Sequence, residues 1–114
     1  EIEKLARDIK NLKEVENLHF YPYFSGIGTP FWKPDAKAAI IGLSRDTSIP
    51  QLCRVCLEGI TLSIDDLLKS LEQDSELSLK EIKVDGGAVA NNLLCKLQAS
   101  FSKINIIRPQ IIET

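Results

Sequence analysis

The sequence has no methionine, one histidine and one tryptophan among its 114 residues. No apolar run approaches the ~20 residues of a membrane-spanning helix, and no secretory signal pattern opens the chain. Lysine and arginine total 14 against 16 acidic residues, and the resulting net charge of −2 offers no basic footprint for nucleic acid. A membrane-spanning protein and a nucleic-acid-binding protein are therefore disfavoured. The absence of methionine, even at position 1, suggests a piece of a longer chain, although a processed chain would look the same.

Cysteine is also scarce, with only Cys53, Cys56 and Cys95. An odd number favours free thiols in a reducing compartment, so we expect a cytoplasmic protein. Cys53 and Cys56 have the spacing of a redox motif, but they fall inside a helical pattern and not at a helix start after a strand. Zinc is disfavoured because there is no second cysteine pair and His19 is the single histidine. We therefore expect buried core thiols and no metal ligands.

The composition fits one small globular unit. Hydrophobic residues make up 44% of the chain and charged residues 26%, an ordinary balance for a folded domain. Helical spacing predicts a first helix over 1–13, with Ile2, Leu5, Ile9 and Leu12 on one face. Residues 19–24 then predict a short strand, which Pro22 favours as an edge or irregular segment. His19 is expected to be a surface or packing residue.

A glycine- and proline-rich loop is predicted at 25–34. Phe31 and Trp32 are expected to anchor it against the body of the protein, and a structural loop is favoured over direct substrate contact. Residues 38–43 are apolar enough to predict a second, buried strand.

A long helix is predicted over 49–73. Ser48 and Gln51 form a capping box before it, and Pro50 is tolerated in the first turn. Gly59, in mid-helix, would allow another element to approach closely, and Glu58 is expected on a solvated face. One apolar stripe is expected to face the core: Leu52, Cys56, Ile60, Ile64, Leu67 and Leu71.

The last third predicts a parallel strand–helix–strand unit, with strands at 82–84 and 104–107 and a helix over 88–101. Gly86 and Gly87 lie between the first strand and the helix. Because glycine has no Cβ and the first helical amides lack intrahelical partners, such a junction can hold a phosphate or the face of a nucleotide. A tight structural turn is the alternative interpretation.

Three segments in order resemble the glycerol kinases of the FGGY carbohydrate kinase family. Residues 84–92 (VDGGAVANN) resemble the family's adenosine-binding segment, and 24–34 (FSGIGTPFWKP) and 39–58 resemble two others. The resemblance implies an α/β fold of the ribonuclease H-like/actin-like ATPase type, with a parallel βαβ core. It also implies that 1–114 is a single partial domain, a portion of the carboxy-terminal, nucleotide-binding domain. Residues 111–114 would begin a further helix.

The resemblance further implies an enzyme that transfers the γ-phosphoryl group of ATP to glycerol with Mg²⁺. Gly87 would then lie against the nucleotide, Gly86 would permit the turn, and Asn91 would bond the adenosine from the first helical turn. Asp85 would make at most an indirect or water-mediated contact.

The family's catalytic aspartate, its phosphate loops and its glycerol-binding amino-terminal domain have no counterpart in these 114 residues. We therefore assign no catalytic or metal-binding residue and expect the chain alone to be inactive. A non-catalytic binding module or a pseudokinase that keeps the scaffold is the alternative. An exposed sheet edge would also favour self-association into a homo-oligomer.

Overall fold

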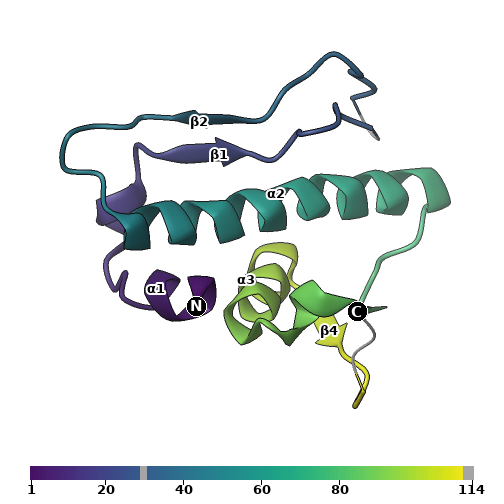
Figure 1. The fold of residues 1–114 in the computed structure, drawn as a ribbon. Helices are drawn as coiled ribbons and strands as arrows, with labels where there is room; N and C mark the ends of the chain where they lie inside the picture. Colours follow the sequence, from purple (N-terminus) through teal and green to yellow (C-terminus); the bar gives the residue numbers. More distant parts are fainter. Residues whose placement is uncertain (29–30, 112–114) are drawn as a thin grey trace.

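The computed structural model describes residues 1–28 and 31–111 (Figure 1). Thr29 and Pro30 of the predicted loop, residues 112–114 of the expected further helix and the side chain of Leu12 lie outside the described residues. In chain order the elements are α1 (Ile2–Ala6), the 3-10 helix η1 (Leu12–Val15), β1 (His19–Tyr21), β2 (Ala39–Ile41), α2 (Ile49–Ser75), β3 (Glu81–Lys83), the 3-10 helix η2 (Gly87–Ala90), α3 (Asn92–Ser102) and β4 (Asn105–Ile107).

The long helix α2 lies between two layers (Figure 1). The β1–β2 hairpin covers one side of it, and α1 and α3 pack on the other. The capping box is confirmed, because Ser48 accepts from the Gln51 amide at 3.3 Å and Gln51 accepts from the Ser48 amide at 2.9 Å. The helix ends at Ser75, two residues beyond the predicted end, and its C-cap residue Glu76 adopts a left-handed conformation with φ of 57°.

The single buried stripe predicted for α2 is wrong in its second half. Ile64, Leu67 and Leu71 are exposed, whereas Thr61 and Asp65 are buried. The reason is that α2 packs on two sides, so its buried positions do not lie on one stripe. Thr61 satisfies its hydroxyl by donating to the Leu57 carbonyl at 2.8 Å, and Asp65 is paired with the Lys69 amine at 2.8 Å.

Gly59 allows the close approach that its position predicts. A Cβ at Gly59 would stand 2.4 Å from the Phe20 carbonyl oxygen and 3.0 Å from the Phe20 ring. Strand β1 therefore crosses α2 at a distance that only glycine permits there.

The two early strands pair as an antiparallel hairpin, with His19 opposite Ile41 and Tyr21 opposite Ala39. The expectation that the second strand is buried is wrong, since Ile41 is 55% exposed. Only β1 packs closely on α2, which leaves β2 on the outside. Phe31 and Trp32 do not anchor the loop either, because they are 52% and 70% exposed.

The first helix is much shorter than predicted. It ends at Ala6, and a separate 3-10 turn begins after Asn11. Asn11 has an extended backbone and its side chain accepts from the Lys13 amide at 3.0 Å. This local side-chain bond competes with continuation of the α-helix. Ile9, one of the apolar residues at helical spacing, is nevertheless buried in the core.

The parallel βαβ unit is confirmed. Strands β3 and β4 pair in parallel, with Ile82 beside Ile106. Between them α3 buries Leu93, Leu94 and Leu97, which share a core cluster with Ala6 and Leu57. The α/β class predicted from the sequence is therefore correct. None of the described helices is long and apolar enough to cross a membrane.

Candidate functional site

The Gly86–Gly87 junction follows the carboxyl end of β3. The Val84 amide extends the strand ladder by donating to the Ile107 carbonyl at 2.9 Å. Gly86 then turns the chain with φ of +103°, a conformation that L side chains rarely adopt, and nothing lies within 4 Å of where its Cβ would stand. Asp85 accepts from the Gly86 amide at 2.7 Å. The backbone here is both sharply turned and open to an approaching group.

Asn91 is the N-cap of α3. The sequence predicts it in the first turn of the helix, and that prediction is wrong. Residues 87–90 form the 3-10 helix η2, and Asn91 has an extended backbone before α3 begins. Its Oδ1 accepts from the Leu94 amide at 2.9 Å. The cap therefore uses the side-chain oxygen, while the Nδ2 group still has hydrogens to donate to a ligand.

Two side chains that the sequence did not single out hold this segment in place. Arg108, just after β4, donates through Nη1 to the Val89 carbonyl at 2.9 Å and to Asn92 Oδ1 at 2.7 Å. Glu3, in α1, accepts from the Leu93 amide at 3.0 Å. These bonds span 16 to 90 positions of sequence, so no local spacing could have indicated them.

The carboxylate of Glu3 is also paired with the Arg7 guanidinium at 2.7 Å. The hydrogen bond from Arg7, followed by that from the Leu93 amide, lowers the pKa of Glu3, although partial burial opposes the shift. A negative charge is therefore kept at the amino-terminal end of α3, where the helix dipole stabilises it.

The first amides of α3 are already occupied. Leu93 donates to Glu3 and Leu94 donates to Asn91. A helix start can bind phosphate when these groups are open. The geometry therefore disfavours a phosphate at the start of α3.

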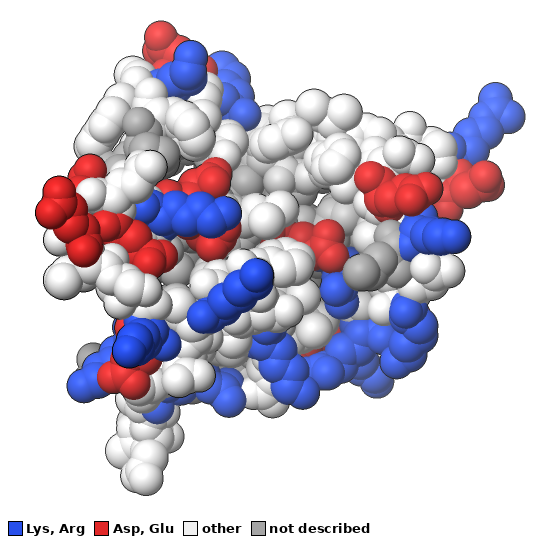
Figure 2. All heavy atoms as spheres, turned by 180° about the vertical axis from the view of Figure 1, so that it is seen from behind, with Lys and Arg blue, Asp and Glu red and all other residues white. Residues whose placement is uncertain are grey.

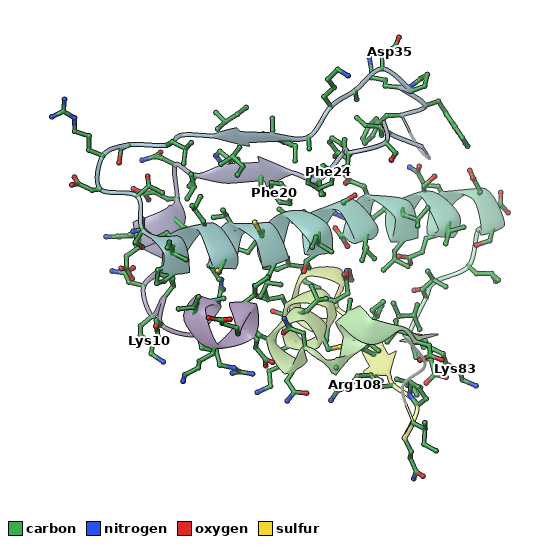
Figure 3. The ribbon with its side chains drawn as sticks, viewed as in Figure 1. Lys10, Phe20, Phe24, Asp35, Lys83 and Arg108 are labelled. Atoms are coloured by element: carbon green, nitrogen blue, oxygen red, sulfur yellow. The ribbon has the colours of Figure 1, made fainter. Side chains whose placement is uncertain are left out.

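A hollow of about 290 Å³ lies at the carboxyl ends of β3 and β4. Its lining comprises Lys83, Val84, Asp85, Ile107, Arg108 and Pro109. Lys83 and Arg108 come from the two neighbouring strand ends (Figure 3). Ligands of open parallel sheets bind outside the carboxyl ends of the strands, so this hollow and the adjacent glycines form the candidate site.

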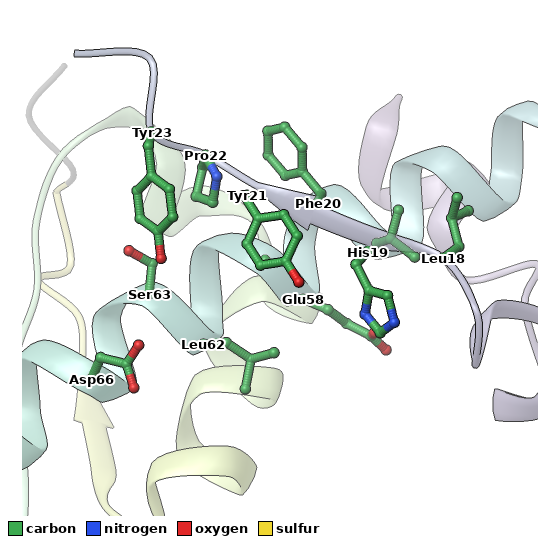
Figure 4. A pocket seen from close by; sticks show the side chains of 12 residues that line it. Leu18, His19, Phe20, Tyr21, Pro22, Tyr23, Glu58, Leu62, Ser63 and Asp66 are labelled. Carbon is green, nitrogen blue, oxygen red and sulfur yellow. The ribbon is translucent and has the colours of Figure 1, made fainter. Parts of the chain in front are cut away.

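A second hollow, of about 180 Å³, lies between β1 and α2 (Figure 4). His19, Tyr21, Glu58 and Asp66 contribute to its lining. Glu58 is not the solvated residue expected, because it is half-buried and bonded to Arg54 at 2.8 Å. Strand β1 lies on the side of α2 away from α3 (Figure 1), so this hollow, lined by β1 and α2, is separate from the glycine junction.

The candidate site fits a nucleotide better than it fits a metal ion. Gly86 provides an open backbone surface, whereas no three His, Cys, Asp or Glu side chains gather into a metal-binding group among the described residues.

The three thiols are free and half-buried, and are less buried than expected. Burial, followed by the nearby Cys53, raises the pKa of the Cys56 thiol.

Comparison with known proteins agrees with the family resemblance. Residues 3–114 match the C-terminal domain of the FGGY family of carbohydrate kinases. A glycerol kinase from Haloferax volcanii is 40% identical over 114 residues, which cover 100% of this chain and 22% of that protein. The chain thus spans about a fifth of the length of this relative.

Solved structures of sugar kinases share the fold. The glycerol kinase of Plasmodium falciparum, solved with ADP, superposes with a TM-score of 0.86 at 25% identity, covering 96% of this chain and 21% of that one. A xylulose kinase from Bifidobacterium adolescentis gives a TM-score of 0.78 at 29% identity, covering 99% and 22%. The expected ribonuclease H-like/actin-like fold is confirmed, and the chain belongs to the FGGY family of carbohydrate kinases.

Proposed function

We propose that this chain is the nucleotide-binding part of a glycerol kinase, which transfers the γ-phosphoryl group of ATP to glycerol. The open, positive-φ backbone of Gly86 at the carboxyl end of a parallel strand is the observation that carries the proposal. The 40% identity to a glycerol kinase supports the choice of substrate. On this proposal residues 1–114 are a portion of the carboxy-terminal domain, and glycerol is held mainly by an amino-terminal domain.

The adenosine part of the nucleotide lies against Gly86 and Gly87 in this proposal. Gly87 presents only backbone, so a flat ring system can approach it. Because Oδ1 of Asn91 caps α3, Asn91 meets the nucleotide through Nδ2, and its partner is a hydrogen-bond acceptor. Asp85 acts indirectly, by holding the Gly86 amide.

ATP would supply the phosphoryl group, and bound Mg²⁺ would neutralise its charge. The described residues do not gather a magnesium site, so we assign none to this chain. We expect the 114 residues alone to show no glycerol-dependent turnover.

The half-buried free thiols favour a cytoplasmic location.

The experiment uses variants of Asn91 in the full-length protein. Aspartate and serine cap helices as well as asparagine, so Asn91→Asp and Asn91→Ser keep the cap and remove the amide donor. We expect both to keep the melting temperature and to raise the Kd for ATP several-fold to about tenfold, the usual effect of one lost hydrogen bond. Glycerol binding should not change.

Asn91→Ala is the matched control, because it loses cap and donor together. If Asn91 only caps the helix, Asn91→Ala will melt earlier while all three variants bind ATP like the wild type. Absence of ATP binding in the wild-type protein would overturn the proposed function itself. ATP binding without phosphoryl transfer to glycerol would favour the alternative, a pseudokinase or binding module.

A further inference from the structure

Segment 87–92 carries the proposed nucleotide contacts but has little regular structure of its own. It consists of the short 3-10 helix η2, the extended residue Asn91 and Asn92, the first residue of α3. Short 3-10 turns have poorer hydrogen-bond geometry than α-helices. The conformation of this segment therefore depends on bonds from other parts of the chain.

Arg108 supplies two such bonds from a single atom. Its Nη1 group has two hydrogens, and donates one to the Val89 carbonyl at 2.9 Å and one to Asn92 Oδ1 at 2.7 Å. Val89 and Asn92 stand on either side of Asn91. Arg108 thus ties together the two ends of the turn that presents the Asn91 side chain.

The strand register determines where Arg108 stands. Lys83 pairs with Ile107 in the parallel β3–β4 ladder, so Arg108 follows β4 at the same edge at which the chain leaves β3 for Gly86. Its guanidinium can therefore reach across to η2 without disturbing the sheet.

We propose that Arg108 is a positioning residue, which fixes segment 87–92 in its nucleotide-binding conformation and so sets the affinity for ATP. This inference rests on the proposed function. Holding a binding loop in its bound shape raises affinity because less conformational freedom is lost on binding. The fixed planar fork of the arginine side chain suits this role, since it loses little freedom per bond.

The basic surface around Arg108 provides a matched control. Lysine and arginine side chains gather along the lower edge of the rear face (Figure 2). Arg7, Lys96 and Arg108 line one wide hollow, so Lys96→Met removes a positive charge close to Arg108 without removing the two bonds. If Arg108 acted only by attracting the anionic nucleotide, Lys96→Met and Arg108→Met would raise the KM for ATP by the same factor.

Steady-state kinetics of the full-length kinase test the proposal. Arg108→Met should raise the KM for ATP about fivefold to tenfold, as expected for the loss of hydrogen bonds from a charged donor. The kcat and the KM for glycerol should remain at wild-type values, and Arg108→Lys should restore part of the ATP affinity. Lys96→Met should leave all three constants unchanged.

Asn92→Ala separates positioning from direct contact between Arg108 and the nucleotide, because it removes one bond while Arg108 stays. Positioning predicts a rise in the KM for ATP of about twofold to threefold. It also predicts that the double variant Asn92→Ala/Arg108→Met is no worse than Arg108→Met alone. An unchanged KM in Asn92→Ala, or additive effects in the double variant, would overturn the proposal.

Amide hydrogen exchange without nucleotide gives a readout independent of activity. Amides in 87–94 should exchange faster in Arg108→Met than in Lys96→Met, while those of α2 remain as in the wild type. Equal exchange in the two variants would refute positioning, even if ATP binding were weakened. If the wild type neither binds ATP nor turns over glycerol, the proposed function fails, and the exchange result still decides whether Arg108 orders the segment.

Discussion

Glu3 Oε1 accepts a hydrogen bond from the Leu93 amide at 3.0 Å, although the two residues are 90 positions apart in the sequence. The bond joins α1 to the first turn of α3. Close by, Ala6 is fully buried in the core cluster that contains Leu93 and Leu94. The short helix α1 is therefore an integral part of the layer that supports the glycine junction.

Replacing Glu3 by alanine should destabilise the fold, because the Leu93 amide loses its acceptor. We expect a loss of about 1–2 kcal/mol in the free energy of unfolding, measured by urea denaturation. Glu3→Gln should retain most of the stability, since its carbonyl oxygen can still accept. Arg7→Ala removes only the exposed partner and should cost no more than ~0.5 kcal/mol. If Glu3→Ala and Glu3→Gln lost the same free energy of unfolding, the stabilisation would come from the charge of Glu3 and not from its hydrogen bond to the Leu93 amide.

The lowered pKa of Glu3 also predicts a dependence on pH. The bond from Arg7 and then that from Leu93 favour the ionised carboxylate in the folded state. Its contribution to stability is thus fully present at neutral pH and is lost as the pH falls below about 4. Urea midpoints measured from pH 7 to pH 3 should fall more steeply for the wild type than for Glu3→Gln. If the urea midpoints of the wild type and Glu3→Gln fell in parallel with pH, the ionised Glu3 carboxylate would not be the source of the pH dependence.

Gly59→Ala should be destabilising despite the higher helix propensity of alanine. The new Cβ would meet the Phe20 carbonyl oxygen at 2.4 Å, so β1 or α2 has to move. Overpacking of this kind costs about 1–3 kcal/mol, against a propensity gain of ~1 kcal/mol. Gly28→Ala is the control, because nothing lies within 4 Å of the added Cβ. A Gly59→Ala variant that melts at or above the wild-type temperature would show that β1 does not cross α2 so closely.

The cysteines should titrate as three free thiols in unfolded protein without reductant. In the native protein the raised pKa of Cys56 leaves less thiolate at pH 8, so its alkylation should be slower than that of an unhindered thiol. Mass spectrometry after timed alkylation identifies the slow site, and the rate should rise with pH. A titre of one thiol would reveal a disulfide and contradict the structure.

Local sequence determined much of the framework. The Ser48–Gln51 capping box starts α2 where it was predicted, because the bonds involved lie within three positions. The alternating apolar residues around Ile82 and Ile106 mark the paired parallel strands. Gly86 marks the turn, since its φ of +103° excludes most other residues. These features depend on neighbours in the chain, and the sequence shows those neighbours directly.

Tertiary structure decided the rest. Asn91 caps α3 because η2 interrupts the helical pattern, and Thr61 and Asp65 are buried because α2 is covered on two sides. Glu3 and Arg108 reach the glycine segment only after α1 and β4 have packed beside α3. Such contacts join residues far apart in the chain, so periodicity and propensity carry no information about them. The sequence by itself determined the elements and the glycine turn, whereas packing decided which side chains support it.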